Sequence, residues 1–321
     1  MEKITSSEAL AEIISASCSL SEADRNKLAN NAEIIRKNLC AINEPHEKTF
    51  SYILTYADFL KECKGSGYVT RIASRDIKGI KLWSIEPPCG STTYILDFDK
   101  SLLAVDAGYP CYKEELHNVI LKIIPDFDTR EKDLILTHMD MDHCGLLSVF
   151  DNIFMSRTTY ENFVRKRKGE DDLREANHTR APFYRISSIL CDDIAPDTSN
   201  MKALNTAEPD LSKPLSFIGN RDFSGFIFEF YETSGGHVDG SIVFLCRELE
   251  LIFTGDTLIN TADLTDGQKE FNKFAPYVIR SVNQDSKKAL LERQEVYNLI
   301  GDKGWIVCGG HGACFNNPQK E

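Results

Sequence analysis

The chain has 321 residues, of which 42% are hydrophobic and 27% are charged, and this balance is typical of a globular protein with one large α/β domain and an appendage, or with two small domains. Lysine and arginine number 37 against 49 aspartates and glutamates, so the net charge is −12, which excludes nucleic acid as an expected partner. No stretch approaches the ~20 apolar residues that span a bilayer and the start resembles no secretory signal, so we expect a cytoplasmic protein with no membrane partner.

The first 66 residues are predicted to form a helical extension. From residue 6 to about 64 the pattern is helical: Phe50, Ile53, Leu54 and Leu60 recur at three- and four-residue steps, and Ser21 with Asp24 resembles a capping box. At Gly65-Ser66-Gly67 the pattern changes. We therefore expect residues 1–66 to be an appendage that packs on the remaining chain, 67–321, and that offers a surface for a homo-oligomer.

Strand and helix patterns are mixed through the rest of the chain. Helical spacing covers 113–124 and 286–300. Residues 153–223 fit the order poorly and are predicted to be an insertion, of the kind that covers a site as a lid. Mixed elements over some 250 residues predict sheets sandwiched between helices. Apolar or β-branched runs predict strands at 93–98, 102–106, 134–137, 226–231, 241–246, 249–253 and 305–308, with turns at Asp99-Lys100 and Arg247-Glu248.

The stretch richest in chemistry is THMDMDHCG at 137–145, where an apolar strand ends and a helix can begin. On an extended segment His138, Asp140 and Asp142 project to one side, while the methionines between them pack behind. Where a helix starts, Asp142 and His143 diverge and can serve different metals. Four such groups at the end of an apolar strand leave uncompensated charge unless a cation lies among them. The stretch therefore predicts a metal site.

Other interpretations of this stretch fit less well. Asp140, Asp142, Gly145 and Asp151 imitate four positions of an EF-hand loop, but a cysteine takes another position and a strand precedes the loop. Cys144 beside a histidine suggests a catalytic thiol, but that histidine is better used as a metal ligand. The ten cysteines are scattered without a C-x-x-C pair, which favours reduced thiols over disulfides or a zinc ribbon.

Three later segments place a histidine or an aspartate at the end of a predicted strand. His237 lies in SGGHVDGS at 234–241, Asp256 in FTGDTL at 253–258, and His311 in CGGHG at 308–312. Small glycine neighbours let a ligand approach the backbone at such turns. Together with the earlier stretch, these segments use four of the seven histidines of the chain.

In this order the segments resemble the metallo-β-lactamase superfamily, whose pattern is H-x-H-x-D-H, then G-H-x-x-G-S, then T-G-D-T-L and a late G-H. The resemblance covers about 67–321 and implies an α/β fold, an αββα sandwich that holds two metals at one edge of its sheets. It implies that the first metal is held by His138, Asp140 and His237, that the second is held by Asp142, His143 and His311, that Asp256 bridges both, and that Asp106 supports the ligands from behind.

One departure from the family pattern is Asp140, which stands where most hydrolases of the family have a second histidine. A third carboxylate lowers the charge of the dinuclear site and makes its metals weaker Lewis acids. It also shifts the preference from zinc toward manganese or iron. A relative of this pattern, with glutamate at the same position, resembles the flavodiiron proteins of the superfamily.

The resemblance implies a metal-dependent hydrolase with two divalent ions, zinc, iron or manganese. A hydroxide held between them would cleave an ester, thioester, lactone or phosphodiester bond of a small molecule, with Asp142 orienting the nucleophile or taking its proton. Two alternatives stay open: a diiron protein that binds oxygen or reduces oxygen or NO, and a metal-stabilised binding or sensing module. In the insertion, Tyr160, Phe183, Tyr184 and Arg185 are candidates to line the pocket.

Overall fold

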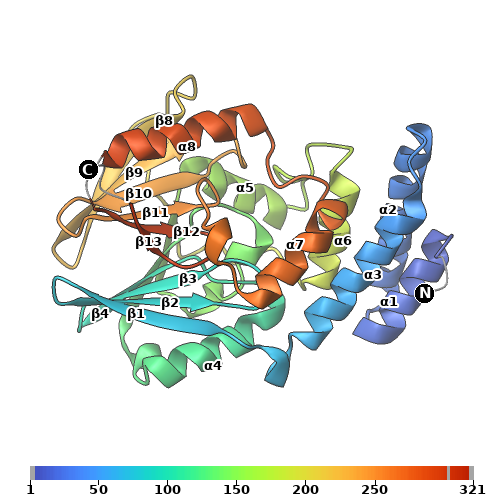
Figure 1. Ribbon diagram of the computed structural model, residues 1–321, viewed down its shortest axis with the longest axis horizontal. Helices are drawn as coiled ribbons and strands as arrows, with labels where there is room; N and C mark the ends of the chain where they lie inside the picture. Colours follow the sequence, from blue (N-terminus) through green and yellow to red (C-terminus); the bar gives the residue numbers. More distant parts are fainter. Residues whose placement is uncertain (1–3, 302–303, 318–321) are drawn as a thin grey trace.

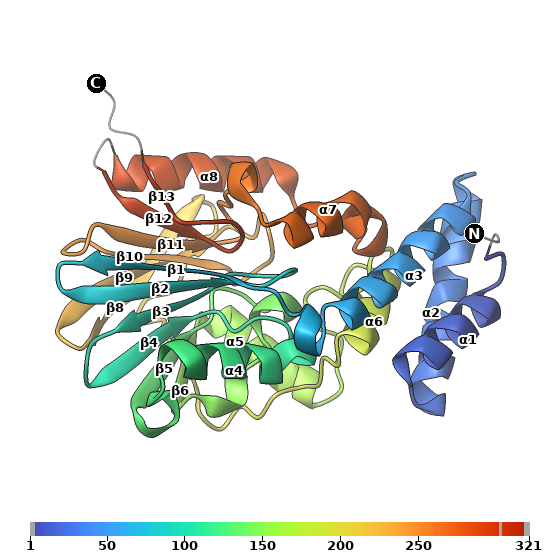
Figure 2. The same ribbon diagram turned by 60° about the horizontal axis from the view of Figure 1, so that its bottom comes forward.

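The computed structural model describes residues 4–301 and 304–317, and their core is two mixed sheets packed face to face. Helices α4 (Lys113–Ile123) and α5 (Arg157–Arg167) lie on the outer side of one sheet, and α8 (Ser286–Ile300) lies on the outer side of the other (Figures 1 and 2). This arrangement confirms the predicted αββα sandwich with helices at the N-terminus. Among the described residues, none of the helices is long and apolar enough to cross a membrane.

The first sheet has seven strands in chain order. Its first four strands pair antiparallel, and each later strand pairs parallel with the one before it. Because parallel strands end at the same edge, the loops that follow β4, β5 and β6 lie together. The strands are β1 (Arg71–Ile77), β2 (Ile80–Glu86), β3 (Thr93–Asp97), β4 (Ser101–Val105), β5 (Glu131–Ile135), β6 (Asn152–Met155) and β7 (Met201–Ala203).

The second sheet has six strands in the order β13-β12-β11-β10-β9-β8. Only β11 and β12 pair in parallel, so the loops after these two strands share one edge. The strands are β8 (Leu215–Phe223), β9 (Phe226–Thr233), β10 (Ile242–Cys246), β11 (Leu251–Gly255), β12 (Ile306–Gly309) and β13 (Phe315–Asn316). The turn from β10 to β11 spans residues 247–250, two residues longer than predicted.

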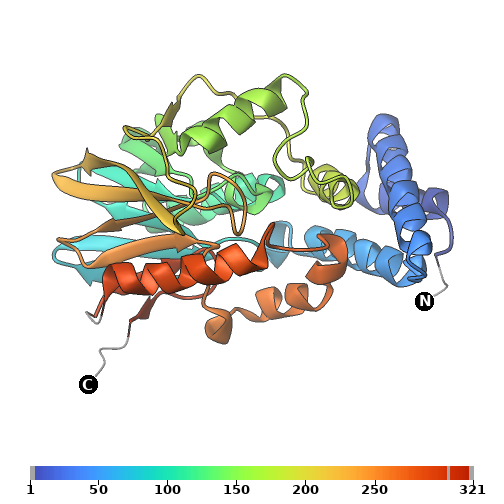
Figure 3. The same cartoon turned by 90° about the horizontal axis from the view of Figure 1, so that it is seen from above.

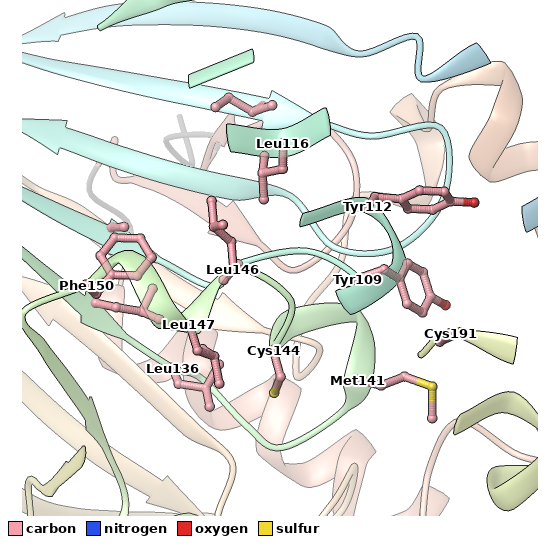
Figure 4. Close-up of a cluster of buried hydrophobic side chains, with 14 of the residues drawn as sticks. Tyr109, Tyr112, Leu116, Leu136, Met141, Cys144, Leu146, Leu147, Phe150 and Cys191 are labelled. Carbon is pink, nitrogen blue, oxygen red and sulfur yellow. The ribbon is translucent and has the colours of Figure 1, made fainter. Parts of the chain in front are cut away.

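Two apolar layers hold these parts together. Between the sheets, Tyr94 of β3 and Phe253 of β11 pack edge to face, with 5.5 Å between their ring centroids. Outside the first sheet, a second cluster packs under α4 and around the loops at the sheet edge; Figure 4 shows Tyr109, Tyr112, Met141 and Cys144 among its members. Burial of both faces explains why the central strands are continuous apolar runs. All ten cysteines are free thiols.

Strands β1 and β2 were not predicted by the sequence pattern. Five consecutive residues of β1 are exposed, because this strand lies at the edge of its sheet. An edge strand with polar side chains lacks the apolar run or alternation that marks a buried strand. The sequence of β1 therefore contains no pattern that predicts a strand.

The N-terminal extension consists of three helices, α1 (Ser7–Cys18), α2 (Glu22–Ala41) and α3 (His46–Glu62). The Ser21 side chain accepts a hydrogen bond from the Asp24 N–H at the start of α2, as the capping pattern predicts. Helix α2 packs against α6 (Ala181–Leu190), and α3 packs against α7 (Asp266–Val278), as Figures 1 and 3 show. The extension therefore contacts the rest of the chain through helices α6 and α7.

Strand β6 ends within the range predicted as an insertion, and strands β7 and β8 lie within it, so only residues 156–200 and 204–214 of that range lie outside the sheets. The first of these segments carries α5 and α6. It connects β6 to β7 and runs along the edge of the sheets where the loops of the predicted ligands lie.

Candidate metal centre

The structure brings all seven predicted ligands to one edge of the sandwich. The 138–143 loop follows β5, Asp256 follows β11, His311 follows β12, and His237 lies in the connection between β9 and β10. Three overlapping groups of ligand atoms lie within 4.8 Å of one another: His138, Asp140 and His237; His138, His143 and Asp256; and Asp142, His143 and His311.

The prediction that a helix begins within the 137–145 stretch is wrong. Residues 141–143 form a single 3₁₀ turn, and the chain then continues as a loop. Backbone hydrogen bonds tie this loop to the one after β4, from Ala107 N to the His143 carbonyl (2.8 Å) and from Gly145 N to the Gly108 carbonyl (2.6 Å). A Cβ at Gly145 would lie 2.3 Å from the Tyr109 carbonyl oxygen, so glycine allows this close approach. These contacts replace the helical hydrogen bonds.

The distances between ligand atoms fit shared cations. At the first position, Asp140 Oδ2 lies 3.0 Å from His237 Nε2 and 3.4 Å from His138 Nε2. At the second, His311 Nε2 lies 3.4 Å from a carboxylate oxygen of Asp142 and 3.4 Å from one of Asp256. Ligand atoms around one tetrahedral metal at roughly 2.0–2.1 Å lie about 3.4 Å from each other.

Asp256 lies between the two positions. One carboxylate oxygen is 3.5 Å from His143 Nε2, and the other is 3.6 Å from His237 Nε2. A Cβ on Gly310 would lie 2.0 Å from the first of these oxygens, which explains why a glycine precedes His311. This placement is the one that a bridging ligand requires.

Hydrogen bonds on the far side of the rings orient three of the four imidazoles. Asp106 Oδ2 accepts from His143 Nδ1 (2.8 Å), and Thr137 Oγ1 donates to the same carboxylate and accepts from His138 Nδ1 (2.9 Å). Asn283 Oδ1 accepts from His237 Nδ1 (3.1 Å). The Nδ1 atom of each of these rings therefore has an acceptor for its proton, and Nε2 faces the centre. Asp106 thus contacts one predicted ligand directly and a second one through Thr137.

Several buried atoms of the centre have no hydrogen-bond partner within the described part of the chain. They are His138 Nε2, His143 Nε2 and Asp256 Oδ1, and these three residues form one of the groups whose ligand atoms lie within 4.8 Å of one another. Buried polar atoms are normally paired, and a cation would satisfy all three at once. The residues present therefore fit a pair of metal ions.

The charges of the centre shift its pKa values strongly. Burial opposes ionisation of Asp256, but the His311 and His143 rings hold its pKa well below the ordinary value. Burial also opposes protonation of His311, yet Asp256 and Asp142 raise its pKa to about 10. Without a metal the His311 ring thus holds a proton as a counter-charge, and a divalent ion has to replace this proton.

An arginine that the sequence analysis did not select joins the first position. The Arg174 guanidinium donates from Nε to Asp140 Oδ1 (2.7 Å), and its Nη2 contacts Asp140 Oδ2 and His237 Nε2. Although burial alone would raise it, this guanidinium and the two neighbouring imidazoles hold the pKa of Asp140 well below its usual range. Arg174 comes from the segment between α5 and α6, which carries no recognisable motif.

A cavity of about 370 Å³ opens onto the centre. Five of the predicted ligands line it, and so does Tyr56 of α3, which brings the N-terminal extension to the site. Of the four insertion residues proposed for the pocket, only Tyr184 lines the cavity. Phe183 is buried against the N-terminal helices, and Arg185 pairs with Glu175. Arginine side chains of the cavity wall, Arg180 and Arg293, were not predicted.

Comparisons with known proteins agree with this fold. Residues 87–311 match the model of the metallo-β-lactamase superfamily. No curated protein matches the chain in sequence.

Similar solved structures include a flavoprotein from Thermotoga maritima, with 15% identity over 79% of this chain and a TM-score of 0.47. This chain spans only 59% of the length of that flavoprotein. A metallo-β-lactamase from Pontibacter korlensis has 13% identity over 77% of this chain and 94% of its own, with a TM-score of 0.48. An archaeal metallo-β-lactamase superfamily protein from Sulfolobus tokodaii has 17% identity over 74% of this chain and 81% of its own, with a TM-score of 0.45.

Proposed function

This chain belongs to the metallo-β-lactamase superfamily, and from that premise we propose that it is a metal-dependent hydrolase of a small organic molecule. The observation that supports this proposal most is the cavity of about 370 Å³ whose wall includes ligands of both metal positions. A volume of this size suits a small-molecule substrate. Diatomic ligands such as oxygen or NO need far less space.

In this proposal, one metal position is formed by His138, Asp140 and His237, the other by Asp142, His143 and His311, with Asp256 shared between them. When bound, divalent ions supply Lewis acidity for the substrate and lower the pKa of a coordinated water. The ligands themselves are held in place by Asp106, Thr137 and Asn283.

Asp142 is the proposed proton acceptor. Its side chain lines the cavity, and Ser91 Oγ holds its backbone by donating to the Asp142 carbonyl (2.6 Å). Burial opposes ionisation, but the His143 and His311 rings hold the pKa of this carboxyl below its ordinary value. An ionised Asp142 at the cavity wall can orient the attacking water or accept its proton.

The remaining cavity wall favours a substrate with an apolar body and an anionic group. Tyr184, Phe271 and Val282 supply apolar surface. Arg180 donates to the Asn283 carbonyl (2.6 Å) and, within the described residues, pairs with no carboxylate, which leaves donors for an anion. We therefore place esters, thioesters, lactones and phosphodiesters that carry a carboxylate or phosphate group first among the substrates.

The test is a panel of these four bond types, each with and without an anionic group, assayed with protein loaded with manganese, iron or zinc. The proposal predicts turnover of at least one bond type that is lost on chelation and in Asp142→Asn. A protein that binds both metals but hydrolyses no member of the panel would instead support a binding or sensing module.

Asp140 favours a second candidate, a diiron protein that binds or reduces oxygen or NO. Three carboxylates and four imidazoles form a ligand set that suits iron or manganese better than zinc. The visible spectrum of the iron-loaded protein separates the two proposals. An oxygen-dependent absorption band without hydrolysis would favour the diiron protein, and hydrolysis by a colourless form would favour the hydrolase.

A further inference from the structure

Every N–H of the Arg174 guanidinium has an acceptor. Nε and one N–H of Nη2 go to the two oxygens of Asp140, and Nη1 reaches the carbonyl oxygens of His237 (3.4 Å) and Val282 (3.2 Å). The fifth contact runs from Nη2 to His237 Nε2 (3.1 Å). His237 Nε2 also lies 3.0 Å from Asp140 Oδ2, so the Arg174–Asp140 pair contacts the nitrogen with which this ring would bind a metal.

The backbone around Arg174 is held firmly in place. Asp172 Oδ1 accepts from the N–H groups of Arg174 (2.8 Å) and Glu175 (3.0 Å), and Asn162 Oδ1 accepts from Leu173 N (2.9 Å). The Arg174 side chain is only 11% exposed. Its guanidinium is therefore a built part of the first metal position, unlike a mobile surface side chain.

Among residues 4–301 and 304–317, no lysine or arginine pairs with the carboxylates of the second position. In the part of the chain that the structure describes, the ion-pair partners of Asp142 and Asp256 are all histidines. The carboxylate of the first position, Asp140, is paired with a permanent positive charge, and the carboxylate of the second is not. The two positions thus differ in charge although their donor atoms are alike.

The difference in charge between the two positions affects how readily each of them binds a divalent ion. A partner that accepts an N–H from a ligand, as Asp106 does from His143, increases the basicity of the ligand. Arg174 does the opposite, because it donates to both carboxylate oxygens of Asp140 and contacts His237 Nε2. A divalent ion at the first position has to displace two of these contacts and to lie beside a positive charge.

We propose that Arg174 is an internal competitor for the first metal ion, so that the second position fills first and the first position fills only at higher metal concentration. The inference rests on the dinuclear centre of the proposed function. It adds a one-metal form in which the guanidinium stays on Asp140 and His237.

The test is a calorimetric titration of the metal-free protein with Mn²⁺, followed by electron paramagnetic resonance at one and at two equivalents. The wild-type protein is expected to bind in two steps that differ by about tenfold or more, with a mononuclear signal after the first step. Arg174→Met is expected to strengthen the weaker step by about 10- to 100-fold and to change the tighter step by less than about threefold. Arg174→Gln, which keeps an amide donor for Asp140, is expected to act in the same direction if the methionine variant does not fold.

Arg167→Met is the matched control, because Arg167 lies in the same insertion and pairs with Asp197, and neither residue lines the cavity. It is expected to titrate like the wild-type protein. Two equal steps in the wild-type protein, or a weaker step that both Arg174 variants leave unchanged or weaken further, would overturn the inference. A wild-type protein that binds no metal would refute the dinuclear centre itself.

Discussion

Replacing Asp106 with asparagine tests how the protein holds its metal ligands in position. Asp106 is 2% exposed, and its carboxylate accepts from Thr137 N (2.8 Å), Thr137 Oγ1 and His143 Nδ1 (2.8 Å). Asparagine keeps the shape but has one acceptor oxygen and no charge. If the amide N–H₂ replaces Oδ2, it faces the N–H of His143 Nδ1, and two donors cannot form a hydrogen bond. The His143 ring then loses the contact that fixes its tautomer.

The size of the effect follows from the lost contact. A hydrogen bond to a charged group contributes roughly 1.5–3 kcal/mol, and each 1.4 kcal/mol corresponds to about tenfold in affinity. We expect Asp106→Asn to weaken metal binding at the second position by about 10- to 100-fold. The first position should weaken less, because Asp106 reaches His138 only through Thr137.

The assay is competition for Mn²⁺ against a chelator of known affinity. Asp151→Asn is the control. Like Asp106, Asp151 accepts a hydrogen bond from a backbone N–H, that of Lys132 (2.9 Å), but it lies outside the centre. A second-position affinity within about threefold of the wild-type value in Asp106→Asn would show that this carboxylate does not support the ligands.

Three further variants test other parts of the account. Asp256→Ala should reduce bound metal to one equivalent or none, and retention of two equivalents by elemental analysis would disprove its bridging role. Asp140→His should shift the metal preference toward zinc, and an unchanged metal profile would show that this carboxylate does not tune the centre. Burial raises the pKa of Asp172 from 3.8 to about 6, so its charged form destabilises the folded state above about pH 6 and costs nothing below about pH 3.8. Asp172→Asn should therefore stabilise the fold by up to ~3 kcal/mol at about pH 8 and by much less at about pH 4, and equal changes in melting temperature at both would contradict this.

The predicted ligands lie in short stretches of sequence, and the order of these stretches along the chain identifies the family that they resemble. His138, Asp140, Asp142 and His143 lie within six positions, and the other three ligands each follow a predicted strand. A local pattern of this kind is visible without knowing how the chain folds. The mixture of strands and helices predicted sheets between helices, and the resemblance of these segments to the metallo-β-lactamase superfamily implied the αββα sandwich.

Arg174 could not be predicted in this way. It lies 34 positions beyond Asp140 in a segment rich in charged residues, where one arginine looks like any other. Its role depends on the turn that Asp172 caps and on the path of the chain back toward the sheet edge. Tyr56 escaped prediction for a similar reason, because the apolar spacing of α3 shows only that this side chain is buried.

The central claim is that seven side chains, distant in sequence, hold two metal ions, and a crystal structure grown with excess Mn²⁺ tests it most directly by anomalous scattering. We expect two anomalous peaks at the end of the cavity. One peak should contact His138, Asp140 and His237, the other Asp142, His143 and His311, with Asp256 in contact with both. Peaks elsewhere in the molecule, or ligand side chains that point away from one another in the metal-soaked crystal, would contradict it.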